Sequence, residues 1–150
     1  MVSCSMMDDE WIQHVRANCA EPPLFIAEGV FYFFTKEQIR NFLRRLSDAF
    51  PGAGLVFDAV SPWFLKLSNL RHPLKSSRLE FALRPVATEI SQWDARNSVE
   101  DYIGFGDPPA YQDVMHRFSW WKRIARRVLP ATRHSFMVVH VGFHTEQEQQ

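Results

Sequence analysis

The sequence predicts an α/β fold, in which flanking helices cover parallel strands and a final antiparallel strand completes the sheet. The apolar runs Leu24–Ala27 and Gly54–Val60 have the length and composition of strands, and an amphipathic helix lies between them. Strand, helix and strand joined by short connections form a βαβ unit with parallel strands and a right-handed crossover. The apolar segment Ser135–Phe143 predicts the last strand.

The helix of this unit has the clearest sequence signals. Thr35 stands three residues before Gln38, which is the spacing of a capping box, and Pro51-Gly52 ends the helix. One face of the helix is apolar and the other is charged, so the apolar face is expected to cover the sheet. The apolar residues are Ile39, Phe42, Leu43, Leu46 and Phe50.

The remaining segments give weaker patterns. The run Leu24–Ala27 is continuously apolar, which favours a strand buried on both faces. Trp63, Phe64 and Leu67 are expected to point inward from a helix. The expected helices are 8–18, Ser61–Leu70, Ala87–Trp93 and Val114–Val128, and a further strand is expected at Val99–Phe105.

Composition excludes several classes of protein. The chain has 150 residues, enough for one domain, and its apolar fraction of 46% argues against disorder. Seventeen basic and seventeen acidic residues balance, so nothing favours a nucleic-acid or membrane partner. The opening segment lacks the basic and then apolar run of a signal peptide. Cys4 and Cys19 are therefore expected to be reduced thiols of a cytoplasmic protein.

Several segments resemble one enzyme family in the same order. They are the loop Ser5–Trp11, PLFIAEGVFYFF at Pro23–Phe34, TKEQIRNFLRRL after it, FPGA at Phe50–Ala53, LVFDAVSPW at Leu55–Trp63, RHPL at Arg71–Leu74 and the closing VVHVGF. Together they resemble the C-terminal half of S-adenosylmethionine-dependent O-methyltransferases of the leucine carboxyl methyltransferase family. The resemblance implies a Rossmann-like class I methyltransferase fold, S-adenosylmethionine as cofactor, and methyl transfer to an oxygen of a small-molecule, polyketide-like acceptor.

The resemblance also implies that half of the usual domain is missing. In this family a glycine-rich cofactor loop lies upstream of the segment that matches Ser5–Trp11, and none of the six glycines here forms such a cluster. Residues 1–150 are therefore expected to be a single, partial methyltransferase domain. The alternative is a catalytically silent remnant that forms a homo-oligomer or pairs with another chain through the exposed edge of the strand Leu24–Ala27.

Glu28 is the leading candidate for cofactor binding. It directly follows a predicted buried strand, and ligands of open α/β sheets bind at the carboxyl ends of strands. The resemblance places Glu28 beside the methionine portion of S-adenosylmethionine, where its charge suits an ammonium group. The competing interpretation is a structural carboxylate that caps a neighbouring loop.

The resemblance places Ser5 and Met6 beside the adenine, with Asp8 nearby. An acidic residue at the start of a helix explains Asp8 equally well, and that structural interpretation is favoured for Asp9.

Tyr32 and Phe33 are the candidates for acceptor binding. The family usually has tyrosine at the place of Phe33, and here the tyrosine stands one position earlier. On an extended segment neighbouring side chains face opposite ways, so Tyr32 is not expected to replace the missing hydroxyl. No residue is assigned a catalytic role. His140 and His144 fall on a strand and its polar tail, where their spacing does not form a metal-binding pair.

Overall fold

The computed structural model describes residues 4–71, 78–84, 87–104 and 135–145. Its centre is a four-stranded sheet in the order β1-β2-β4-β3, formed by β1 (Leu24–Ala27), β2 (Gly54–Val60), β3 (Asn97–Gly104) and β4 (Phe136–Phe143). The β1 and β2 strands are parallel, and β4 runs antiparallel to both of its neighbours, β2 and β3. The predicted α/β class, the parallel pair and the final antiparallel strand are therefore confirmed.

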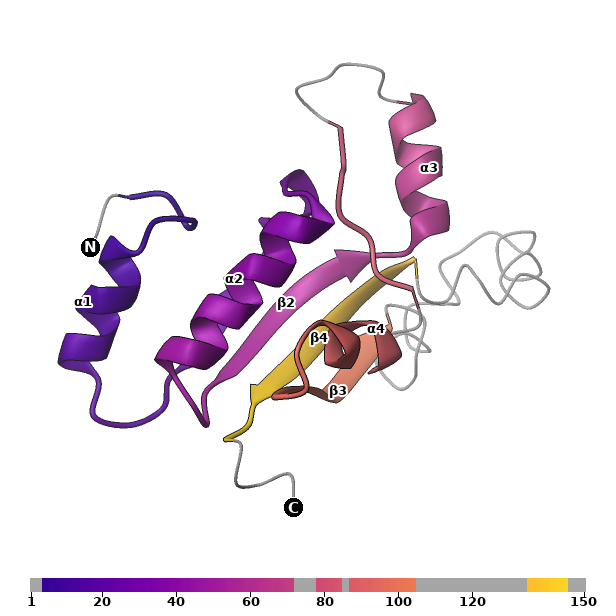
Figure 1. Cartoon of the computed structure of the whole chain (residues 1–150). Helices are drawn as coiled ribbons and strands as arrows, with labels where there is room; N and C mark the ends of the chain where they lie inside the picture. The colour runs from indigo at the N-terminus through magenta and orange to yellow at the C-terminus, as the bar shows by residue number, and fades with distance from the viewer. Residues whose placement is uncertain (1–3, 72–77, 85–86, 105–134, 146–150) are drawn as a thin grey trace, which may run out of the picture.

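Three helices cover one face of the sheet (Figure 1). They are α1 (Glu10–Asn18), α2 (Lys36–Ala49) and α4 (Ala87–Trp93), and their apolar side chains share a core with β2 and β4. The α2 helix begins with the predicted capping box between Thr35 and Gln38. Its predicted apolar face is buried, with Ile39, Leu43 and Leu46 fully shielded from solvent.

The opposite face of the sheet differs from the prediction at β1. Leu24 is 60% exposed and Ile26 is 74% exposed, so β1 is not buried on both faces. The reason is that α1, α2 and α4 all lie on the other face, so that only Phe25 and Ala27 of β1 pack against the core.

The α3 helix (Pro62–Arg71) also departs from the prediction. It contains no fully buried residue, and Trp63 is 47% exposed rather than turned inward. Phe64 does pack inward, with its ring centroid 4.3 Å from that of Phe136 in β4.

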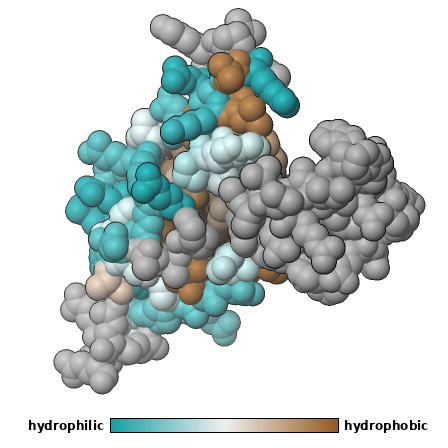
Figure 2. Space-filling view, turned by 90° about the vertical axis from the view of Figure 1, so that its right-hand side faces the viewer, coloured by the Kyte–Doolittle hydropathy of each residue, from teal (hydrophilic) through white to brown (hydrophobic). Residues whose placement is uncertain are grey.

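The side of the molecule in Figure 2 is mainly hydrophilic where residues are described, with hydrophobic residues in small patches.

Two predictions concern residues outside the described ranges. The helix Val114–Val128 lies there entirely, and so does Phe105, the last residue of the predicted strand Val99–Phe105. The observed β3 begins two residues earlier than predicted and contains a register shift between Val99 and Asp101. Within the described ranges, no helix has both the length and the apolar character needed to cross a bilayer.

Candidate functional site

The carboxyl ends of the parallel strands β1 and β2 form the centre of the candidate site. Asp58, near the end of β2, accepts a hydrogen bond from the backbone N–H of Gly29, with 2.8 Å between nitrogen and Oδ1. Gly29 follows β1 and has a φ of 69°, in the left-handed region that glycine adopts without steric cost. The side chain of one strand therefore fixes the turn that leaves its neighbour.

The second oxygen of the same carboxylate binds Tyr32. The Tyr32 hydroxyl donates to Oδ2 of Asp58 at 2.5 Å, and its backbone carbonyl accepts a hydrogen bond of 2.7 Å from the N–H of Glu80. Burial of the phenol, the hydrogen bond to Asp58 and the charges of Asp58 and Glu28 all raise the pKa of Tyr32 above its ordinary value. Tyr32 therefore stays protonated at neutral pH.

The segment around Tyr32 is a short 3-10 helix, η1 (Phe31–Phe33), and not the extended chain that the sequence suggested. Phe31 is completely buried against the rings of Phe42, Phe57 and Phe81. Phe33 is 56% exposed. The prediction of an extended segment at Tyr32 and Phe33 was therefore wrong, because burial of Phe31 winds this segment into a helical turn.

Glu28 lies between β1 and the Gly29 turn, and it is exposed. Within the described part of the chain, no hydrogen bond or ion pair engages its carboxylate. Its charge is nevertheless close enough to raise the pKa of Tyr32. The structural alternative for Glu28 was a carboxylate that caps a neighbouring loop. Asp58 caps the Gly29 turn instead, so the oxygens of Glu28 remain able to bind a ligand.

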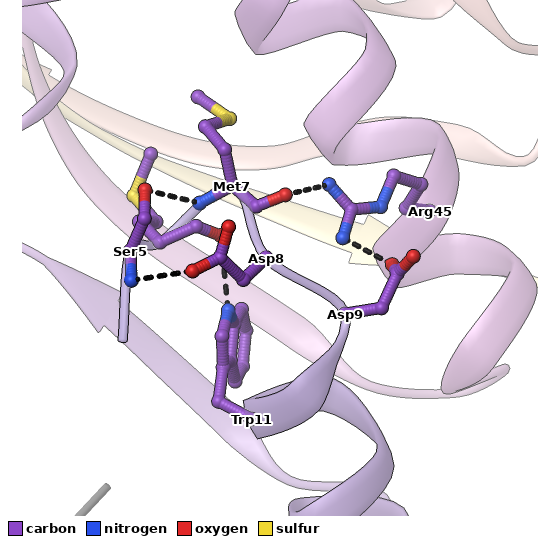
Figure 3. Close-up of polar contacts among 7 residues, drawn as sticks. Ser5, Met7, Asp8, Asp9, Trp11 and Arg45 are labelled. Carbon is purple, nitrogen blue, oxygen red and sulfur yellow. Dashed lines mark hydrogen bonds and ion pairs between the residues drawn. The ribbon is translucent and has the colours of Figure 1, made fainter. Parts of the chain in front are cut away.

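A compact loop before α1 holds the other predicted residues (Figure 3). The Asp8 carboxylate accepts from the Ser5 N–H at 2.9 Å, and the Ser5 hydroxyl oxygen accepts from the Met7 N–H at 3.2 Å. The indole N–H of Trp11 donates to the Met6 carbonyl at 2.9 Å. The polar groups of Ser5 and Asp8 therefore shape the loop. Asp8 does so by closing the loop, and the N-cap of α1 is Asp9.

This loop is fastened to α2 by Arg45. The guanidinium donates to the Met7 carbonyl at 2.6 Å and forms an ion pair with Asp9. The structural interpretation of Asp9 agrees with this pairing. The sequence does not distinguish Arg45 from the other basic residues on the polar face of the helix, so this contact could not be predicted from it.

An open pocket of about 320 Å³ connects the loop with β1. Met6 and Trp11 contribute to it from the loop side, and Ala27, which directly precedes Glu28, contributes from β1. The pocket therefore brings Met6 to the same side of the molecule as the Glu28 turn. Its lining is mainly apolar: Cys4, Met6, Trp11, Phe25, Ile26, Ala27, Phe42 and Leu55.

The residue that sequence reasoning missed is Asp58. In the sequence, Asp58 is a single polar residue near the end of the apolar strand GLVFDAV, which by itself does not indicate a site. The signal was its place in a parallel pair: the carboxyl ends of β1 and β2 meet at one edge, so Asp58 must lie near Glu28.

The histidines lie elsewhere. His144 follows β4 and contacts Glu100, with 2.8 Å between Nε2 and Oε1, while His140 is within β4. Hydrogen bonds from Ser98 and His144 lower the pKa of Glu100, and the charges of both histidines contribute further to this lowering.

Comparison with known proteins places these features in context. No protein-family profile matches the chain. Over 81 residues, 54% of its length, the chain is 28% identical to the tetracenomycin polyketide synthesis O-methyltransferase TcmP of Streptomyces glaucescens, and the match spans 29% of that protein.

A solved structure, of a duf574 family protein from Streptomyces avermitilis, has a similar fold. It matches with a TM-score of 0.55 at 14% identity, and the match covers 96% of this chain and 54% of that one. The chain thus spans about half the length of its structural relative and less than a third of TcmP. Membership of the leucine carboxyl methyltransferase family stays a prediction. Over about half of its length the chain is a distant relative of an O-methyltransferase, and its α/β fold is similar to that of the duf574 family protein.

Proposed function

We propose that this chain is the C-terminal half of an S-adenosylmethionine-dependent O-methyltransferase domain and forms one wall of its cofactor site. The observation that supports this most directly is the exposed Glu28 carboxylate. It lies at the carboxyl end of a parallel strand and has no partner among the described residues. The similarity to TcmP supports the same activity.

The residues present suit the two ends of this cofactor. An ionised carboxylate only accepts hydrogen bonds, so Glu28 complements the ammonium of the methionine portion. The apolar pocket beside Met6 suits the flat adenine, with the loop around Ser5 and Asp8 as its border. The bound cofactor supplies a methyl group that its sulfonium makes electrophilic.

The protein's own contribution is to bind and orient the reactants. The ring of Tyr32 and the exposed Phe33 lie on the turn after Glu28 and are proposed to contact a small-molecule acceptor. The name of TcmP assigns it to polyketide synthesis, so we propose a polyketide-like molecule as the class of acceptor. Alignment of the acceptor oxygen with the methyl carbon supplies most of the rate enhancement in this scheme. Free thiols at Cys4 and Cys19 agree with a cytoplasmic location, which is also proposed.

The cofactor site can be tested by nuclear magnetic resonance titration with S-adenosylhomocysteine. The chain supplies one wall of the site, so we expect affinity weaker than micromolar, with shifts at Met6, Glu28 and Gly29. Replacing Glu28 with Gln should weaken binding by about 1.5–3 kcal/mol, the range for hydrogen bonds to charged groups. The matched control is Glu21→Gln, another exposed carboxylate just before β1. Equal affinities of Glu28→Gln and the unaltered chain would remove Glu28 from the site.

A second candidate function is pairing with another chain through β1. It is favoured by the exposure of Leu24 and Ile26 on an end strand, because such edges accept further strands. Sedimentation analysis tests whether a homo-oligomer forms. Replacing Ile26 with Lys should then shift the chain to monomer. A chain that sediments as a monomer at all concentrations contradicts self-pairing.

A further inference from the structure

We infer that Asp58 is a positioning residue of the cofactor site: it fixes the Gly29 turn and directs the Tyr32 proton inward, so that Glu28 and the Tyr32 oxygen together offer only hydrogen-bond acceptors to the ligand's ammonium group. This role rests on the proposed function. Each oxygen of Asp58 already accepts one hydrogen bond within the chain, from Gly29 and from Tyr32, so the role inferred for Asp58 is to position these groups and not to contact the ligand.

The first part of this role concerns the backbone. The turn after β1 requires the left-handed conformation of Gly29, and the hydrogen bond from its N–H to Asp58 holds it there. Glu28 is the residue between the strand and this turn. Its direction therefore depends on a side chain of β2, and fixing a binding group in advance lowers the entropy cost of binding.

The second part concerns a single proton. A tyrosine hydroxyl has one hydrogen to donate and lone pairs with which to accept. The Tyr32 hydrogen is committed to Asp58 in a short, charge-assisted bond. Any further hydrogen bond of this hydroxyl must therefore be one that it accepts.

The two parts produce one kind of surface. The ionised Glu28 carboxylate accepts hydrogen bonds and donates none, and the same now holds for the exposed side of the Tyr32 hydroxyl. The two groups belong to one short segment, because Glu28 directly precedes the Gly29 turn and Tyr32 follows it in η1, with Gly29 and Tyr32 held by the same carboxylate. An ammonium group has three donors and no acceptor, so it complements this pair.

Asp58→Asn tests the role with little change in shape. The Asn oxygen can still accept from the Gly29 N–H, but its amide nitrogen donates to Tyr32, which turns the phenol proton toward the ligand. A donor then faces the ammonium. We expect affinity for S-adenosylhomocysteine to fall about tenfold. Affinity for 5′-methylthioadenosine, which lacks the amino-acid portion, should stay unchanged.

Tyr32→Phe is the second variant, and it separates the two parts. It leaves the bond between Asp58 and Gly29 in place, so hydrogen exchange of the Gly29 amide should stay slow. Affinity for S-adenosylhomocysteine should fall roughly two- to tenfold, the range for one neutral hydrogen bond. Asp101→Asn, an exposed carboxylate on β3 at the far side of the sheet, is the charge-matched control and should change neither ligand's affinity.

The outcomes separate this role from the proposed function. If Glu28→Gln weakens S-adenosylhomocysteine binding and Asp58→Asn does not, the positioning role is wrong and the cofactor site stands. Equal losses of affinity for both ligands in Asp58→Asn would show a general structural role and would also overturn the positioning role. The positioning role is likewise wrong if Asp58→Asn does not fold and Tyr32→Phe binds S-adenosylhomocysteine as tightly as the unaltered chain. If the unaltered chain shows no shifts with the ligand at millimolar concentrations, the proposed function fails and the ligand role of Asp58 with it.

Discussion

The Arg45 guanidinium in α2 donates a hydrogen bond to the carbonyl oxygen of Met7, 2.6 Å away. This contact joins the loop before α1 to a helix that is separated from it by the whole of β1. The other hydrogen bonds of the loop join residues within 5–11, so the contact with Arg45 is what fixes the loop relative to α2 and the pocket.

Replacing Arg45 with Met should loosen this loop. We expect the free energy of unfolding to fall by about 1–2 kcal/mol, because a charged donor to a backbone carbonyl is lost. Urea unfolding measures this loss, and amide exchange should quicken at Met7 and Asp8. Arg40, exposed on the same helix, provides the control variant Arg40→Met. Equal effects of the two substitutions would mean that the contact with Met7 contributes nothing.

Phe31 and Phe33 differ in burial although they lie two residues apart. Phe31→Ala should destabilise the fold by about 3–5 kcal/mol, because it removes a fully buried ring from the core. Phe33→Ala should stay within about 0.5 kcal/mol of the unaltered chain, since Phe33 is mainly exposed. Chemical unfolding followed by circular dichroism checks both. A large loss of stability for Phe33→Ala would contradict the observed turn.

Asp94 should make stability depend on pH. Its hydrogen bond with Arg96 is the main cause that lowers the pKa of Asp94 below its ordinary value of 3.8, and the same guanidinium pairs with Asp48 at the end of α2. A carboxyl with a lowered pKa in the folded state stabilises fully above pH 3.8 and loses this contribution as the pH falls through the lowered pKa.

The variant Asp94→Asn measures this contribution. At neutral pH it should cost about 1–2 kcal/mol of unfolding free energy, since the pair is only partly exposed. The difference between variant and unaltered chain should shrink in strong acid. Urea unfolding at several pH values tests the sign, and a difference that grows on acidification would contradict it.

Tyr32 provides a spectroscopic check of its contact with Asp58. Absorbance titration should show one phenol that ionises above the ordinary tyrosine range, because burial and two negative charges raise the pKa of Tyr32. The variant Asp58→Asn should lower that pKa toward about 10, the unperturbed value. Tyr32→Phe identifies the phenol by removing it. An unchanged titration curve in Asp58→Asn would mean that the two side chains do not interact in solution.

The sequence predicted the elements whose signals are local. The capping box at Thr35, the stripe on α2 and the limits of β1 and β2 follow from residue order alone, and all were confirmed. The exposure of Leu24 and Ile26 could not be derived in this way. An apolar run shows that a strand forms, whereas its burial depends on which neighbours the sheet provides.

The site shows the same division. Glu28 was predicted because its position after an apolar run is visible in the sequence, and its exposure agrees with a binding role that stays a proposal. The bonds of Asp58 to Gly29 and Tyr32 join residues that are distant in sequence, so only the folded sheet shows them. The turn at Phe31–Phe33 was missed because a run of aromatic residues has the composition of a strand, and packing of Phe31 overrides it.

The pairing of β2 with both β1 and β4 has a consequence for the order of folding. The β1, α2 and β2 elements come from one continuous stretch, residues 24–60, and their contacts close short loops. The β4 strand must return from far along the chain to pair Val139 with Phe57, which costs more loop-closure entropy. The β1–α2–β2 unit is therefore expected to form first, with the turn of Glu28 and Gly29 already at its edge. Pairing of β4 with β2 then stabilises this unit.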